Sequence, residues 1–339
     1  MGEFLSSPKL KKNSSSGENS ILKYAVCSMQ GWRRTMEDSH LVALDLGENK
    51  ETHIFGVFDG HGGNEVAEYV KNHFVETFIN NENYKKNNIK MALKETFLLL
   101  DRKLQSKEAM KELTKTHEIF VKEYNLDQKE NENENIENNN LNNSDDYIDN
   151  LAYNIGCTCN ILVIHKNILF FANAGDSRSV LLKNKGEVNS MSTDHKPELP
   201  NEFNRIKKAG GKILEGRVNG LLNLSRSIGD FQFKNRRDLK QEDQIVTCNP
   251  DIIFENRSKN DDFVVMGCDG VWECITNTGI SEYIYDKENN SKIYKNGNEK
   301  IDLNLVEILE ELFERIIAKD ENEENGCDNM TAILIQFKK

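Results

Sequence analysis

Short apolar runs in this chain repeatedly meet an aspartate at one end. Asp59, Asp176 and Asp269 each follow such a run directly or after one small residue, and Asp328 precedes the last run, at 330–335. The runs are rich in β-branched and aromatic residues, which is typical of buried strands. The chain must therefore fold so that acidic residues stand at the ends of several buried strands.

Carboxylates at several strand ends can converge on one point. There they would repel one another unless a cation lies between them. A cluster that is rich in oxygen and poor in imidazole suits hard divalent ions such as Mg²⁺ or Mn²⁺. The pattern therefore predicts metal-assisted chemistry on a phosphate.

Composition narrows the class of protein. The chain has 339 residues, 37% of them hydrophobic, and a net charge of −12, which argues against a general nucleic-acid partner. The seven cysteines are scattered, odd in number and without a C-x-x-C pair, which indicates reduced thiols in the cytosol or nucleus. We find no apolar run near the ~20 residues that span a bilayer and no secretory h-region. We therefore expect a cytoplasmic protein, with nuclear or peripheral membrane locations as alternatives.

The chain is predicted to form one α+β domain over residues 21–339, preceded by a mobile, serine-rich tail at 1–20. Helices are expected after the glycine pair at 62–63, at about 89–104 and at about 303–318, each with one apolar face. Residues 125–150 hold ten asparagines, eight acids and one lysine. Such a segment cannot bury enough apolar surface to offset its ordering entropy, so we expect a disordered insertion there.

An ordered set of motifs runs through the whole chain. In chain order these are Met29–Arg33, Met36–Asp38, Val57–Gly63, Gly175–Arg178, Asp194–Pro197, Arg217–Gly220, Leu224–Asp230, Cys268–Trp272 and Asp328–Thr331. In order and spacing this set resembles the metal-dependent protein phosphatases of the phosphatase 2C family, over about residues 22–339. The resemblance implies a central β-sandwich of two antiparallel sheets flanked by α-helices (α-β-β-α), with the metals at one end.

The resemblance also implies the ligands of two Mn²⁺ or Mg²⁺ ions. Asp59 would bridge both ions. The Gly60 carbonyl and Glu37 would complete one site, and Asp269 and Asp328 the other. The implied reaction is hydrolysis of phosphoserine and phosphothreonine in proteins by a water or hydroxide shared between the ions, whose pKa the metals lower.

Further roles follow from residue types and from the same resemblance. The planar fork of Arg33 can bind two phosphate oxygens, and His61 can protonate the leaving alkoxide. In some relatives a third, weaker metal site uses the position of Asp176 with help from that of Glu273, where many relatives carry Asp. The implied partners are phosphoprotein substrates, and the sequence is silent on oligomeric state.

Three alternatives stay open at this stage. Asp176, Asp194 and Asp230 could be structural, each bonding its own loop. Cys27 and Arg33 have the C-x5-R spacing of cysteine-dependent tyrosine phosphatases, although the loop between them is bulky. The chain could also be an inactive relative that binds phosphoproteins, although the implied ligands, Arg33 and His61 are all present.

The first residues match the N-myristoylation pattern M-G-x-x-x-[ST], which points to Gly2 as the acceptor. Lys9, Lys11 and Lys12 follow closely, while Glu3 is atypical of good acceptors. One acyl chain with a basic cluster would give a reversible membrane anchor. The alternative is an unmodified, mobile tail.

Overall fold

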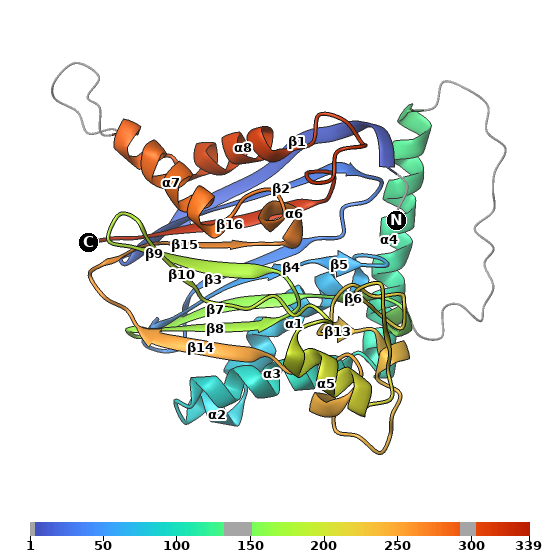
Figure 1. The fold of residues 1–339 in the computed structure, drawn as a ribbon. Helices are drawn as coiled ribbons and strands as arrows, with labels where there is room; N and C mark the ends of the chain where they lie inside the picture. Colours follow the sequence, from blue (N-terminus) through green and yellow to red (C-terminus); the bar gives the residue numbers. More distant parts are fainter. Residues whose placement is uncertain (1–3, 132–150, 292–302) are drawn as a thin grey trace, which may run out of the picture. The chain divides into compact units, whose positions relative to one another are not determined.

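A computed structural model describes residues 4–131, 151–291 and 303–339 (Figure 1). The chain divides into two compact units. Unit 1 comprises residues up to Asp59 together with 159–194 and 251–339, and unit 2 comprises 60–158 and 195–250. Each unit is described by itself.

Two antiparallel sheets are formed by the part of unit 1 that the structure describes. The strands of the first, in spatial order, are β1 (Phe4–Glu18), β2 (Leu22–Arg33), β16 (Met330–Phe337), β15 (Asp261–Gly267), β9 (Arg178–Lys183) and β10 (Glu187–Ser190). The strands of the second are β14 (Asp251–Asn256), β8 (Ile168–Ala174), β7 (Cys159–His165), β4 (Thr52–Phe58) and β3 (Ser39–Leu46).

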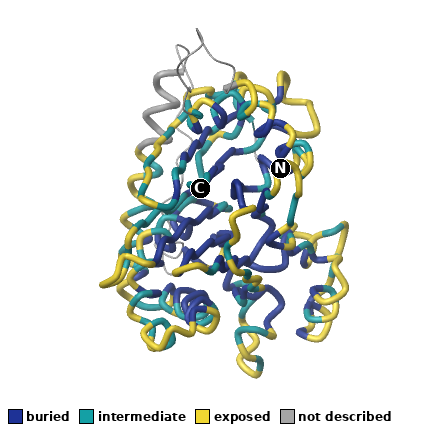
Figure 2. Tube along the Cα trace, turned by 90° about the vertical axis from the view of Figure 1, so that its left-hand side faces the viewer, coloured by how far each residue is buried: buried dark blue, intermediate teal, exposed yellow. Residues whose placement is uncertain are grey.

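The apolar runs of the sequence form the central strands of both sheets. β4, β7 and β15 are buried along their whole length, which is why their sequences do not alternate between apolar and polar residues. The facing sheets share one core, in which the rings of Tyr24 and Phe55 meet edge to face with centroids 5.7 Å apart. Figure 2 shows these buried residues in dark blue.

The described residues of unit 1 form three helices: the short α6 (Asp269–Trp272), α7 (Asn277–Ser291) and α8 (Leu305–Ile316). α8 packs on β1, β2 and β16 through its apolar face, which includes Leu309, Leu312 and Phe313 (Figure 1). The predicted helix at 303–318 is thus confirmed, with slightly narrower bounds.

Unit 2 is mostly helical. Its helices are α1 (Glu65–Ile79), α2 (Glu82–Lys85), α3 (Ile89–Lys103), α4 (Lys107–Asn131) and α5 (Pro200–Lys208), with 3₁₀ turns η2 (Phe231–Phe233) and η3 (Gln241–Asp243). Its short strands are β5 (Gly60–His61), β6 (Gly156–Cys157), β11 (Ile213–Leu214), β12 (Arg217–Val218) and β13 (Ile228–Gly229). α1 packs against α3 and α4, with Phe74 and Phe97 edge to face at 5.9 Å.

The predicted α+β class, the two antiparallel sheets and the helices after 62–63 and at 89–104 are confirmed. The predicted mobile tail is wrong for residues 4–18, which form β1 on β2. The predicted insertion also begins too early, because α4 continues to Asn131. The rest of the insertion, 132–150, and Gly2 lie outside the described residues. Among the helices that the structure describes, we find none long and apolar enough to cross a membrane.

Candidate metal and phosphate site

The strand register of unit 1 brings the predicted acids to the same end of neighbouring strands in each sheet. In the first sheet, Gly267 at the end of β15 pairs with Ala332 of β16 and with Arg178 of β9. Asp269, Asp328 and Asp176 flank those three strand ends. In the second sheet, Phe58 pairs with Ser39, so the residue after β4 and the residues before β3 are neighbours.

Two glycines permit this close approach. A Cβ at Gly270 would lie 2.1 Å from the backbone oxygen of Asn329. At Gly31, which has a φ of +67°, it would lie 2.8 Å from the backbone oxygen of Asp328. The small residue after Asp269 is therefore a packing requirement, because any side chain would push α6 away from the start of β16.

The electrostatic surroundings of Asp59 include several of the predicted acids. Burial raises the pKa of Asp59 well above its usual value, and the charges of Asp269, Asp38, Asp328 and Asp176 raise it further. All these groups act in the same direction, and each disfavours a bare carboxylate at Asp59. The arrangement calls for a cation, as the sequence pattern predicts.

Asp38 is a member of this cluster that the sequence analysis did not assign. Burial, together with the charges of Asp328 and Glu37, raises its pKa to about 7. One oxygen from Asp38, one from Asp59 and the Cys268 sulfur all lie within 4.8 Å of one another. Within the described chain, Asp38 Oδ2 is buried without a hydrogen-bond partner. Its place beside Glu37 in a motif of two successive acids was the available signal.

These residues fit a hard divalent ion. The donor set is dominated by carboxylate oxygens, which Mg²⁺ and Mn²⁺ prefer. The orphaned oxygen of Asp38 and the mutual repulsion around Asp59 are the features that a bound cation would relieve.

Arg33, at the end of β2, is held beside the same acids. Its Nη2 donates to Asp328 Oδ2 at 2.6 Å. Burial alone would lower the pKa of the guanidinium, but the carboxylates of Asp328, Asp269 and Glu37 outweigh burial and raise it. Its Nε is buried and finds no partner in the part of the chain that the structure describes. Arg33 therefore places a fixed positive charge beside the acid cluster.

Asn329 fixes the loop that carries Glu37. Its amide nitrogen donates to the backbone oxygens of Gln30 at 2.8 Å and Thr35 at 3.0 Å, and its amide oxygen accepts from the Glu37 N–H at 2.9 Å. Thr35 Oγ1 in turn donates to Glu37 Oε1 at 2.8 Å. The Asp328-Asn329 pair therefore supplies one acid and positions another.

His61 belongs to unit 2, where it has an acidic partner. Its Nε2 lies 2.7 Å from Oδ2 of Asp230, a buried residue that also accepts from Ser227 Oγ at 2.5 Å. A Cβ at Gly156 would lie 2.2 Å from that carboxylate oxygen, so glycine is required there. Of the three acids considered structural, Asp230 thus contacts a predicted catalytic residue, whereas Asp194 pairs with Arg178 through two hydrogen bonds at 3.0 and 2.7 Å.

The remaining predicted ligands are less constrained. Gly60 lies in β5 and pairs with Cys157 of β6. Asp176 is buried, and its negative charge helps to raise the pKa of Asp59. Glu273 is exposed and follows α6. Its backbone N–H donates to the backbone carbonyl oxygen of Asp269 at 2.8 Å. The third metal site stays a prediction.

The structure disfavours Cys27 as a nucleophile. Cys27 is fully buried inside β2, and burial raises the pKa of its thiol to about 11. Cys27 and Arg33 also lie on one extended strand, which cannot wrap a phosphate with its backbone amides.

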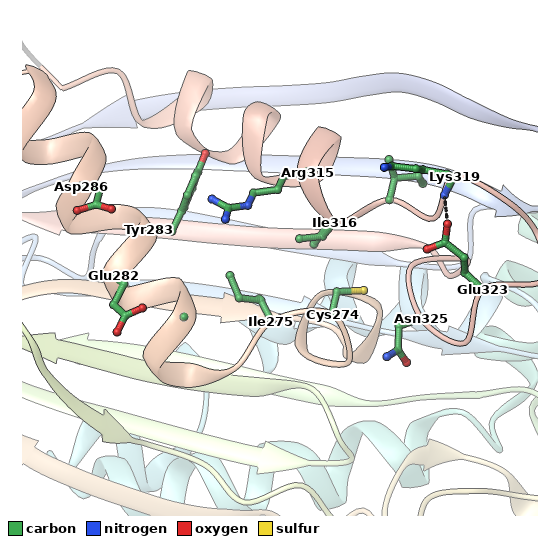
Figure 3. Close-up of a pocket in the computed structure, with 12 residues that line it drawn as sticks. Cys274, Ile275, Glu282, Tyr283, Asp286, Arg315, Ile316, Lys319, Glu323 and Asn325 are labelled. Atoms are coloured by element: carbon green, nitrogen blue, oxygen red, sulfur yellow. Dashed lines mark hydrogen bonds between the residues drawn. The ribbon is translucent and has the colours of Figure 1, made fainter.

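A cavity of about 510 Å³ in unit 1 lies apart from this chemistry (Figure 3). It is lined by Cys274 and Ile275 after α6, Tyr283 and Asp286 of α7, and Arg315 of α8. Among the described residues, its lining includes none of the predicted ligands. The site is therefore defined by the acid cluster and not by this cavity.

Comparisons with known proteins point to one family. The profile of the family described as "Protein phosphatase 2C" matches residues 22–119 and 108–324. The chain is 39% identical to "Probable protein phosphatase 2C 3" of Paramecium tetraurelia over the whole of both chains. It is 38% identical to "Probable protein phosphatase 2C 21" of Arabidopsis thaliana, covering 100% of this chain and 93% of that one. A crystal structure of a serine-threonine phosphatase 2C from Toxoplasma gondii superposes with a TM-score of 0.67 at 18% identity, covering 97% of this chain and 99% of that one, which shows a shared fold.

Proposed function

Because the chain belongs to the protein phosphatase 2C family of metal-dependent protein serine/threonine phosphatases, we propose that its own acid cluster carries that reaction with Mn²⁺ or Mg²⁺. The observation that carries the proposal is the convergence of acids around Asp59. Ligand atoms of Asp38, Asp59 and Cys268 lie within 4.8 Å of one another, and burial together with the charges of four other carboxylates raises the pKa of Asp59. The substrates are phosphoserine and phosphothreonine in proteins. Given the net charge of −12, nucleic acid is not among the partners.

The proposed ligands divide between two ions. Asp59 would serve both, Glu37 and the Gly60 carbonyl would serve one, and Asp269 and Asp328 would serve the other. A weaker third ion would use Asp176 and Glu273. When bound, the ions supply Lewis acidity and lower the pKa of a water that they share, to near neutrality.

Arg33 binds and orients the phosphoryl group in this proposal. Its Nη2 is committed to Asp328, which fixes the plane of the guanidinium beside the acid cluster. A planar fork held in this way binds a tetrahedral anion with a defined orientation, which a lysine could not reproduce.

His61 is the proposed general acid. A carboxylate at its Nε2 stabilises the protonated imidazole and favours a proton on that nitrogen, so Nδ1 is the nitrogen expected to give its proton to the leaving alkoxide. His61→Ala should lower kcat on a phosphothreonine peptide about 10²-fold. The loss on p-nitrophenyl phosphate should be much smaller, because that leaving group needs little protonation.

Phosphate release from a phosphothreonine peptide tests the proposal. Activity should require Mn²⁺ or Mg²⁺ and vanish in excess EDTA, and Asp59→Asn or Asp269→Asn should lower kcat by at least ~10². Asp45→Asn is the matched control, since Asp45 is a partly exposed acid of unit 1 with a φ of +56° that asparagine tolerates. Undiminished activity in chelator would overturn the metal mechanism, and a wild-type enzyme without activity at any metal concentration would favour an inactive binding protein.

Myristoylation of Gly2 and a cytoplasmic enzyme that associates reversibly with membranes are further proposals. They rest on the sequence pattern and on the lysines of β1, since each basic residue near anionic lipid adds roughly 1 kcal/mol of attraction. The intact mass of protein from its native cell decides the matter. A species lacking the initiator methionine and the acyl addition of about 210 Da would end the idea.

A further inference from the structure

The first described residue of the chain lies against the predicted phosphate-binding arginine. The Arg33 Cζ lies over the ring of Phe4, 5.8 Å from its centroid. This distance is within the range of an attractive cation–π contact. We propose that Phe4 is a positioning residue for Arg33, so that the N-terminal strand helps to set the affinity of the enzyme for phosphate.

β1 holds Phe4 at this place. Phe4 is the register partner of Arg33 at the end of β2, and the register shifts between Phe4 and Lys9, so β1 bulges there. Farther along, β1 is tied to α8: Lys12 Nζ donates to Glu314 at 2.8 Å, and Ser14 Oγ to Glu310 at 2.7 Å. The strand is therefore anchored on both of its neighbours.

Phe4 also has apolar neighbours. It packs against the small cluster of Trp32, Ala318 and Cys327, together with Ile317. The Trp32 indole N–H donates to the Ala318 oxygen at 2.9 Å, which fixes this cluster. The ring of Phe4 thus rests on an ordered base and presents a fixed face to the guanidinium.

Arg33 is then constrained in two ways. Asp328 holds one edge of the guanidinium through Nη2, and the aromatic ring of Phe4 lies against the group. An arginine side chain loses rotamer entropy when it is immobilised, and a contact present before the substrate arrives removes part of that loss from the binding step. Loss of the ring should therefore weaken phosphate binding more than it slows the chemical step.

This inference rests on the proposed role of Arg33, so Arg33→Ala is measured beside the Phe4 variants. The readouts are KM and kcat for a phosphothreonine peptide, the inhibition constant of inorganic phosphate, and the melting temperature, all in full-length enzyme with saturating Mn²⁺. Leu10→Ala is the matched control, because Leu10 lies on β1 but is 53% exposed.

Phe4→Ala should raise KM and the phosphate inhibition constant about 3- to 10-fold, with kcat within about twofold. Phe4→Tyr keeps the aromatic face and should restore both constants. Phe4→Leu keeps most of the apolar volume, so it should retain the melting temperature but bind phosphate as weakly as Phe4→Ala. Leu10→Ala should match the wild type.

The outcomes separate the two claims. If Arg33→Ala raises the phosphate inhibition constant at least about 10-fold while all Phe4 variants stay within twofold of wild type, Phe4 does not position Arg33 and the proposed function stands. If Phe4→Leu binds phosphate like wild type, the ring acts through packing and the inference is also overturned. If Arg33→Ala itself changes nothing, the proposed role of Arg33 is wrong.

Discussion

His61 Nε2 lies 2.7 Å from Asp230 Oδ2, a contact between residues 169 positions apart in the chain. Asp230 is fixed from several directions. Its backbone N–H donates to the Ile155 oxygen at 3.0 Å, and Ser227 Oγ donates to the same carboxylate oxygen that His61 meets. A buried, oriented carboxylate of this kind stabilises a protonated imidazole and fixes the direction in which the ring points.

Asp230→Asn should therefore act through His61. Asparagine keeps the volume but loses the charge, so kcat on a phosphothreonine peptide should fall about 10-fold or more, and kcat on p-nitrophenyl phosphate much less. Asp238→Asn is the control, because Asp238 is an exposed acid of the same segment paired with Arg236. Equal losses on both substrates would contradict the assignment and indicate a general structural role for Asp230.

Asp38 makes the metal-free protein sensitive to pH. Its pKa rises from a usual 3.8 to about 7 on folding, so between these values the folded state holds a proton that the unfolded chain has lost. The free energy of unfolding should then decrease as pH rises from about 4 to about 7. Asp38→Asn removes this effect and should stabilise the EDTA-treated protein at pH 8 by up to about 4 kcal/mol, with little change at pH 4.

Urea denaturation of the wild-type and Asp38→Asn proteins at both pH values measures the difference in their free energies of unfolding. An Asp38→Asn protein that is no more stable than wild type at pH 8 would show that Asp38 is not held against its neighbours' charges. Mn²⁺ should narrow the difference, because the bound cation relieves the same repulsion.

Glu202 has a pKa that is lowered on folding, the opposite of Asp38. It receives hydrogen bonds from Arg205 Nη1 at 2.5 Å, Arg226 Nη2 at 2.6 Å and Ser225 Oγ at 2.7 Å. Burial would raise its pKa, but these partners outweigh burial and lower it from 4.5 to about 2. The stabilisation is present above pH 4.5 and is lost as pH falls toward 2. Glu202→Gln should lower the free energy of unfolding at pH 7 by about 3 kcal/mol, and its difference from wild type should shrink at pH 3. A difference that does not depend on pH would contradict this assignment.

The sequence predicted the acids at the strand ends because the physical rule is local. A buried apolar run followed by Asp-Gly marks both the strand and its end, and antiparallel pairing then brings Asp269 and Asp328 together. This rule did not predict β1. Its polar residues show no strand period, and the strand is held by long-range partners such as Glu314 and Glu310 of α8.

The roles of Asp230 and Asp38 were not predicted from the sequence, for related reasons. Nothing local to Asp230 indicates that His61 is its partner, since the contact depends on how unit 2 folds. Asp38 stands directly beside Glu37, which is a local signal, but the motif alone does not distinguish whether one or both of two successive acids join the cluster. The start of the insertion was misplaced because helix α4 continues through a segment whose composition favours solvent.

The number of Mn²⁺ ions bound at equilibrium tests the central claim, that Asp59 and its neighbouring acids form a two-ion centre. Dialysis against Mn²⁺ followed by metal analysis should give two ions per wild-type chain, with a third at higher concentration. Asp59→Asn should bind fewer than two ions, while the Asp45→Asn control keeps both. A wild-type protein that binds no Mn²⁺, or an Asp59→Asn protein that binds as many ions as wild type with equal affinity, would contradict the account.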